Sequence, residues 1–263
     1  LWIVQICLSG TGGRARAEEE ARRFAVRSAS KPGLDDAIAG LLKENEGDAA
    51  GAAAIYRKSL GADPTRVVVA QRLYDLEGGK RGGPFLAPLL RRALAKDARI
   101  DEYHNLLGAI LAEQGRPAEA LESFRRAADL DPDNPRFAAN LAAALAQLSR
   151  WQEAAPAYER AAVLAPSSSL NLKLGSVYRR LGRPEQALSA FERAQALGDT
   201  STAPLLGIAL ARSEMHQIQE ALEVVRQGLD RHPGDPALRS LYDDLLRRTR
   251  TPGSAPGRPG SGR

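Results

Sequence analysis

The sequence is poor in cysteine, in aromatic residues and in long apolar runs. Cys7 is the single cysteine among 263 residues, which excludes an intrachain disulfide and a thiolate metal cluster. Aromatic residues make up 5% of the chain and hydrophobic residues 43%, so the core must be built mainly from leucine and alanine, which favour helices over sheet. The longest apolar run, from Leu1 to Leu8, is shorter than the roughly 20 residues of a membrane-spanning helix. Composition therefore predicts an all-α protein with no full membrane span.

Positive charge is concentrated at the two ends of the chain. The net charge is +5, but five arginines and no acid lie between Arg247 and Arg263, and basic residues also outnumber acidic ones in residues 1–32. The body between these ends is mildly acidic. Because affinity for phosphates grows with the number of cations presented together, we expect no nucleic-acid partner.

A helix-end signal recurs every 33 or 34 residues, and it is most often a proline. It stands at Pro64, Ala98, Pro132, Pro166, Asp199 and Pro233. Before each signal, small and large residues alternate at helical spacing on one stripe, and an earlier Leu-Gly or Leu-Ala pair in the later units marks a second helix. Glycine and proline at 115–117 and 182–184 end one helix and begin the next. Each unit is therefore predicted to be a helix hairpin.

This pattern resembles the tetratricopeptide repeat, a 34-residue helix–turn–helix unit. The unit over residues 101–134 carries the family's signature residues Leu107, Gly108, Leu111, Gly115, Ala120, Phe124, Ala127 and Pro132. The resemblance implies an all-α fold, a right-handed α-solenoid of about six hairpins with a C-terminal capping helix at residues 236–248. The repeats are expected at residues 33–66, 67–100, 101–134, 135–167, 168–201 and 202–235.

The last repeat and the two chain ends depart from this regular pattern. The pair Leu206-Gly207 comes about two residues early, which predicts a longer turn between the helices of that repeat. Residues 1–32 are interpreted either as a signal-peptide remnant cleaved after Ala17 or as an incidental apolar terminus. The first interpretation implies an exported or periplasmic protein and the second a cytoplasmic one. The superhelix is expected over residues 33–249 and a disordered tail over 250–263.

The sequence shows no pattern typical of a metal-binding, phosphate-binding or catalytic site. His104, His216 and His232 are scattered without metal-ligand spacing, so no metal site is predicted. The glycine-rich segment at 77–84 lacks the strand and the Ser or Thr of a phosphate-binding loop and is predicted to be a turn between two helices. We therefore expect no catalytic residues, no cofactor and no enzymatic activity.

The resemblance implies that the first helix of each repeat lines a concave groove that binds a peptide. Carrying over the family's groove positions by count, and aligning the last repeat on Leu206-Gly207, gives Asn105, Arg136, Asn140, Lys173, Ser176, Arg179, Arg180 and Arg212. Most of these are cations, so the expected partner is an acidic segment of another protein. The predicted function is a non-catalytic interaction scaffold that binds a peptide or helix of its partner. The alternatives are a regulatory or docking module of a larger enzyme and an exported envelope-assembly factor.

Overall fold

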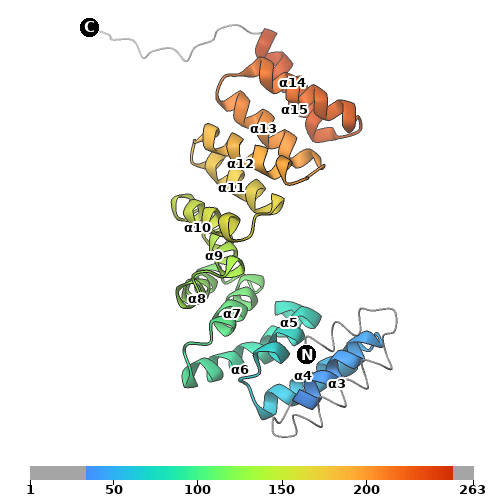
Figure 1. Ribbon diagram of the computed structural model, residues 1–263, viewed down its shortest axis with the longest axis vertical. Coiled ribbons are helices and arrows are strands. Elements are labelled where there is room, and N and C mark those ends of the chain that lie inside the picture. The colour runs from blue at the N-terminus through green and yellow to red at the C-terminus, as the bar shows by residue number, and fades with distance from the viewer. Residues whose placement is uncertain (1–33, 251–263) are drawn as a thin grey trace, which may run out of the picture. The chain divides into compact units, whose positions relative to one another are not determined.

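The computed structural model describes residues 34–250, and this part of the chain consists of helices joined by short turns (Figure 1). The first six helices are α3 (Leu34–Asn45), α4 (Ala49–Ala62), α5 (Val67–Arg81), α6 (Gly83–Lys96), α7 (Asp101–Glu113) and α8 (Pro117–Leu130). The others are α9 (Pro135–Gln147), α10 (Trp151–Leu164), α11 (Ser168–Arg180), α12 (Pro184–Ala196), α13 (Thr202–Glu214), α14 (Ile218–Arg231) and α15 (Pro236–Arg250). Thirteen helices and no strand lie within residues 34–250, which confirms the all-α prediction, with six hairpins and one final helix.

The chain divides into two compact units, residues 1–132 and 133–263, which are described separately. The first contains α3 to α8 and the second α9 to α15. The expectation of one superhelix over residues 33–249 stays a prediction. The predictions of a signal remnant and of a disordered tail concern residues outside the described range, apart from residue 250, at which α15 ends.

In the first unit, the glycine-rich segment interrupts a helix. Helix α5 is broken at Gly78, whose φ of 70° is a left-handed conformation that glycine adopts without strain, and α6 begins only after Gly82. The break leaves the backbone N–H of Gly79 without a helical partner. The carboxylate of Glu113 of α7 accepts a hydrogen bond from that N–H at 2.7 Å and a second one from the hydroxyl of Tyr74. The segment is therefore a helix break followed by a turn, and a carboxylate from the next repeat stabilises it.

In the second unit, each hairpin turns through three residues, and the left-handed conformation falls on a different residue type each time. It is adopted by Ser149 between α9 and α10, by Gly182 between α11 and α12, and by His216 between α13 and α14. The turn between α13 and α14 is thus as short as the others. The expectation of a longer turn in the last repeat was wrong.

The packing around Phe191 of α12 explains that error. An added Cβ at Gly175 would lie 2.6 Å from this ring, and one at Gly207 would lie 2.5 Å from it, so both glycines face Phe191. Gly207 therefore packs on the preceding hairpin. The family glycine position in α13 is taken instead by Ala209, which shares a buried cluster with Val225 of its own hairpin. Because Val225 is smaller than Phe191, its counterpart in the preceding hairpin, the methyl group of Ala209 fits against it.

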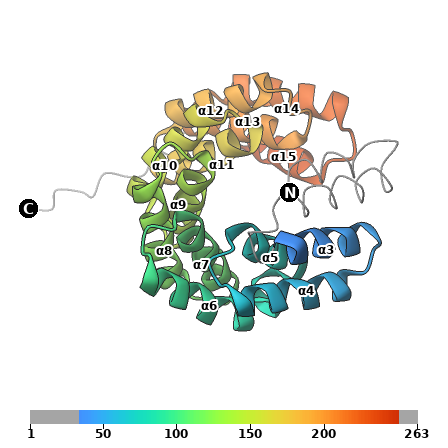
Figure 2. The same ribbon diagram turned by 60° about the horizontal axis from the view of Figure 1, so that its bottom comes forward.

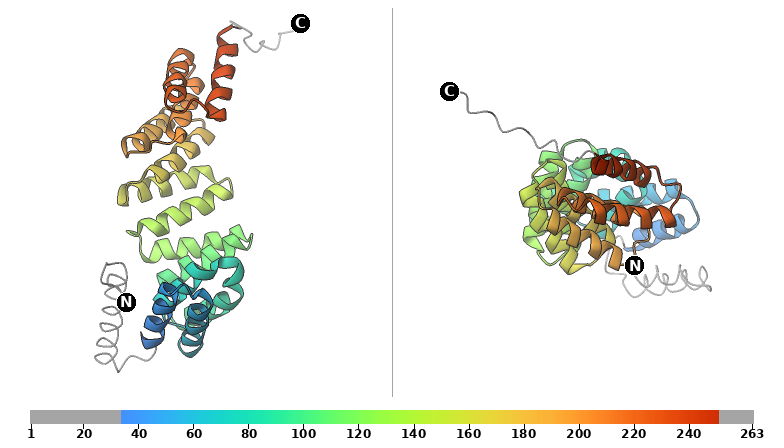
Figure 3. Two further views of the ribbon diagram at one scale, coloured as in Figure 1. Left: turned by 90° about the vertical axis from the view of Figure 1, so that its right-hand side faces the viewer. Right: turned by 90° about the horizontal axis from the view of Figure 1, so that it is seen from above.

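In this unit, the first helices of the hairpins line one face and the second helices line the other. Each second helix packs on the following first helix, and the first helices α11 and α13, and then α13 and α15, also contact each other. No comparable contact joins α10 to α12 or α12 to α14. The unit therefore curves toward its first helices, which lie on the inner side in Figure 2. The left view of Figure 3 shows its hairpins stacked one after another. Leu238 and Leu245 of α15 are fully buried in the terminal cluster, which confirms the capping helix.

Candidate functional site

Helix α11 brings three of the predicted groove residues onto one face. Lys173, Ser176 and Arg180 are spaced by three and then four residues, so their side chains follow one another along the helix. They line a pocket of about 380 Å³ together with residues of α9, α10 and α11 itself, namely Ala146, Trp151, Tyr158, Leu172 and Val177. We call this cavity the Lys173 pocket. Its floor is apolar and its rim is basic.

Both cations of the Lys173 pocket lack an ion-pair partner among the described residues. Lys173 and Arg180 are exposed, and neither forms an ion pair with any residue in the described range 34–250. The guanidinium of Arg180 lies over the ring of Trp151, with its carbon 6.0 Å from the ring centroid. This cation–π contact holds the charge at the edge of the apolar floor. Ser176 donates its hydroxyl to the carbonyl of Leu172 at 2.9 Å.

Arg179 is engaged elsewhere. Its Nη2 lies 2.6 Å from Oε1 of Glu214, and its Nε donates to the same oxygen at 3.0 Å. This ion pair joins α11 to α13, the next first helix. The charge of Arg179 is therefore compensated within the unit, unlike that of its neighbour Arg180.

Arg212 lies at a different place from the one assumed in the sequence alignment. Helix α13 begins at Thr202, which makes Arg212 its eleventh residue and Glu214 its thirteenth. The alignment on Leu206-Gly207 was therefore out of register by two residues. The Nη2 of Arg212 lies 3.9 Å from Oε1 of Glu192 on α12, and its Nε is buried without a hydrogen-bond partner among the described residues. Arg212 thus turns toward the preceding second helix.

The remaining predicted residues lie outside the Lys173 pocket. Arg136 of α9 is exposed, with its guanidinium carbon 5.4 Å from the centroid of the adjacent Phe137 ring. Asn140, also on α9, is half-buried. Asn105 belongs to α7 in the first unit, where 4% of it is exposed. Sequence counting missed Trp151, the first residue of α10, although tryptophan occurs only twice in the chain.

Residues suited to metal binding do not cluster in the part of the chain that is described. Within residues 34–250, no three side chains among histidine, cysteine, aspartate and glutamate lie close enough to hold an ion. No helix in the same range has both the length and the apolar character needed to cross a bilayer. The chemistry offered by the described site is therefore charge complementarity and apolar contact.

These features define a helical-repeat scaffold, and comparison with known proteins gives its family. The tetratricopeptide repeat model matches residues 87–135, 113–169 and 139–202, and a second model of the same repeat matches residues 178–245. Together the matches cover more than half of the chain. The protein belongs to the tetratricopeptide repeat family. No curated protein matches the chain by sequence.

Solved structures of other repeat proteins share this fold. PilW, described as a widely conserved type IV pilus biogenesis factor, is 18% identical with a TM-score of 0.64, over 80% of this chain and 97% of its own. PilF of Pseudomonas aeruginosa is 21% identical with a TM-score of 0.61, over 88% and 98%. YrrB, described as having an unusual peptide-binding site, is 18% identical with a TM-score of 0.54, over 62% and 85%. At these identities the likeness concerns the fold.

Proposed function

We propose that this interaction scaffold binds an acidic segment of a partner protein at the Lys173 pocket, without catalysing a reaction. The observation that carries the proposal is the pair of uncompensated cations, Lys173 and Arg180, above an apolar floor that includes Trp151. A carboxylate that binds such a cation forms a charge-assisted hydrogen bond, and an apolar side chain between two carboxylates would cover the floor.

The spacing of the two cations specifies the form of the segment. They are seven residues apart on α11, which places their backbones about 10.5 Å apart along the helix axis. A peptide in the polyproline II conformation has three residues per turn and rises about 3.1 Å per residue, so carboxylates three residues apart point to the same side and are separated by about 9 Å. We therefore favour a segment in the polyproline II conformation with two acids in the pattern Asp-x-x-Asp, with an apolar residue between them.

Binding of a short rhodamine-labelled peptide, Gly-Asp-Leu-Ala-Asp-amide, to the full chain tests this proposal. A Trp2→Phe background leaves Trp151 as the single tryptophan, so its fluorescence reports the pocket while anisotropy reports binding. We expect the peptide to change the emission of Trp151, and Lys173→Glu or Arg180→Glu to weaken the binding measured by this emission about tenfold or more, because each reverses a charge that meets a carboxylate.

The matched control is Lys58→Glu on α4, another exposed lysine without an ion-pair partner among the described residues. This variant should bind as the wild type does. Equal affinity of the wild type and of both pocket variants would refute the proposal, as would binding that leaves the emission of Trp151 unchanged.

A second candidate function is assembly of an envelope machine, with the same pocket binding a component of that machine. It is supported by the coverage of nearly the whole lengths of PilW and PilF, of which PilW is described as a pilus biogenesis factor. N-terminal sequencing of the protein from its native cell tests the exported form, which requires a mature chain that begins after residue 17. A chain that retains residues 1–17 would contradict export by this route.

A further inference from the structure

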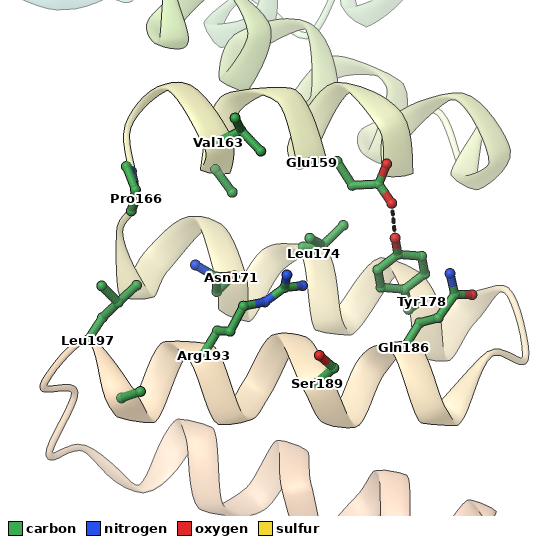
Figure 4. Close-up of a pocket in the computed structure, with 12 residues that line it drawn as sticks. Glu159, Val163, Pro166, Asn171, Leu174, Tyr178, Gln186, Ser189, Arg193 and Leu197 are labelled. Atoms are coloured by element: carbon green, nitrogen blue, oxygen red, sulfur yellow. Dashed lines mark hydrogen bonds between the residues drawn. The ribbon is translucent and has the colours of Figure 1, made fainter.

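A second and larger cavity lies on the other side of α11, between the second helices α10 and α12 (Figure 4). Its volume is about 680 Å³, within the range of ligand-binding pockets. The floor carries Asn171, Leu174 and Tyr178 of α11. Each member of this set lies two positions before its counterpart among Lys173, Ser176 and Arg180. An offset of two residues corresponds to a rotation of about 200° around the helix. We call this cavity the Arg193 pocket. It opens on the face opposite the Lys173 pocket.

Exposed apolar side chains gather at one end of the Arg193 pocket. Among the described residues, four large hydrophobic side chains are exposed, and three of them lie at the C-terminal ends of α10 and α12. These are Val163 at 80%, Leu164 at 38% and Leu197 at 47% exposed. Val163 and Leu197 line the cavity, above the buried Leu174. Covering these side chains with a partner would remove apolar surface from water, which is favourable. Clusters of exposed apolar side chains mark interaction sites.

One cation in the Arg193 pocket has no ion-pair partner in the part of the chain that the structure describes. Arg193 is exposed and forms no ion pair with any residue of the described range, and Figure 4 shows its side chain reaching from α12 toward Asn171 and Leu174. Glu159 of α10 points instead to Tyr178 and accepts its hydroxyl. Burial and this hydrogen bond raise the pKa of Tyr178 to about 12, so the phenol remains a donor to Glu159 at neutral pH. The charge of Arg193 is therefore available to an occupant.

We propose that the Arg193 pocket is a second binding site, which takes a short segment of a partner protein that carries one carboxylate next to a large aliphatic side chain. The carboxylate binds the Arg193 guanidinium, and the aliphatic side chain covers Val163 and Leu197. The Arg193 pocket differs from the Lys173 pocket in charge, because it presents one cation and is therefore complementary to one carboxylate. Together with the Lys173 pocket, this site gives the scaffold one binding site on each face of the second unit.

Anisotropy of a rhodamine-labelled peptide, Gly-Ala-Leu-Asp-Ala-amide, measures this binding to the full chain. We expect Arg193→Glu to weaken it about tenfold or more, because the substitution removes a charge-assisted hydrogen bond and adds repulsion. The double variant Val163→Ser with Leu197→Ser should weaken it as well. The matched control is Arg231→Glu, because Arg231 stands in the last turn of α14 as Arg193 does in α12, and it is exposed without an ion-pair partner among the described residues.

The double variant Lys173→Glu with Arg180→Glu separates this inference from the proposed function. It should leave the binding of the single-acid peptide unchanged, and the peptide should not alter the emission of Trp151 in the Trp2→Phe background. The inference is overturned if wild type binds no peptide, if Arg193→Glu binds as tightly as wild type, or if the Lys173 and Arg180 variant loses the binding. It is also overturned if a peptide with lysine in place of aspartate binds equally well. Circular dichroism confirms that each variant is folded.

Discussion

Phe191 lies between two glycines, and a single added methyl group tests the packing on both sides of its ring. In Gly175→Ala the new Cβ would lie 2.6 Å from one ring carbon and 2.8 Å from two others. Movement of the ring is restricted, because Gly207 also lies close to it, with an added Cβ only 2.5 Å from the nearest ring carbon. Overpacking of a core costs about 1–3 kcal/mol, and the upper part of that range applies when the neighbour is a trapped ring. Alanine gains about 1 kcal/mol of helix propensity over glycine. The expected result is a net loss of about 1–2 kcal/mol.

Urea unfolding followed by circular dichroism at 222 nm measures this loss. Gly61→Ala in α4 is the matched control, since an added Cβ there meets nothing within 4 Å, and it should be neutral or slightly stabilising. Adding Phe191→Leu to Gly175→Ala should cost less than the sum of the single losses, because both changes act on one contact. A Gly175→Ala protein that equals or exceeds the stability of wild type would refute the packing argument.

Further predictions concern acid stability, alkaline stability and the capping helix. The backbone N–H of Leu238 and other donors lower the folded pKa of Asp235 below its ordinary value. The stability from this carboxylate is therefore present above the unfolded pKa, near 3.9, and is lost as the pH falls through the folded pKa, so Asp235→Asn should flatten the fall in the urea midpoint below about pH 4. The raised pKa of Tyr178 acts in the opposite direction. Its contribution is present below about pH 10 and is lost as the pH rises through about 12, so Tyr178→Phe should flatten the alkaline fall in the midpoint. Leu245→Ala removes a fully buried side chain from α15 and should lower the unfolding free energy by about 2–5 kcal/mol in the same urea assay, whereas a loss below about 1 kcal/mol would contradict the capping role.

Much of the fold was predictable because each hairpin is local in sequence. A period of 33 or 34 residues and the Gly-Arg-Pro turn at 182–184 are sufficient to place α11 and α12. Two other turns carry no glycine signal, since Ser149 and His216 adopt the left-handed conformation. The register of α13 was missed for a related reason. Ala209 and Val225 replace the glycine and the aromatic residue that mark this contact in the hairpin of α7 and α8.

The candidate site was predictable only where one helix supplies it. Counting the family's groove positions along α11 gave Lys173, Ser176 and Arg180, and helical spacing places these three side chains on a common face. Trp151 comes from another helix, so no count along α11 could include it. The partner of Arg179 is Glu214, which is 35 residues away and lies close only once the hairpins stack. Charge pairing of this kind depends on tertiary structure, and composition does not reveal it.

The most direct test of the central claim is a charge swap at the Lys173 pocket. The full chain with Lys173→Glu and Arg180→Glu in the Trp2→Phe background is titrated with the Gly-Asp-Leu-Ala-Asp-amide peptide and with its counterpart, in which both aspartates are lysines, and binding is measured by the emission of Trp151. If the two cations recognise two carboxylates, the variant should lose the acidic peptide and bind the basic one at least about tenfold more tightly than wild type does. Equal affinities of wild type and variant for both peptides would contradict the account.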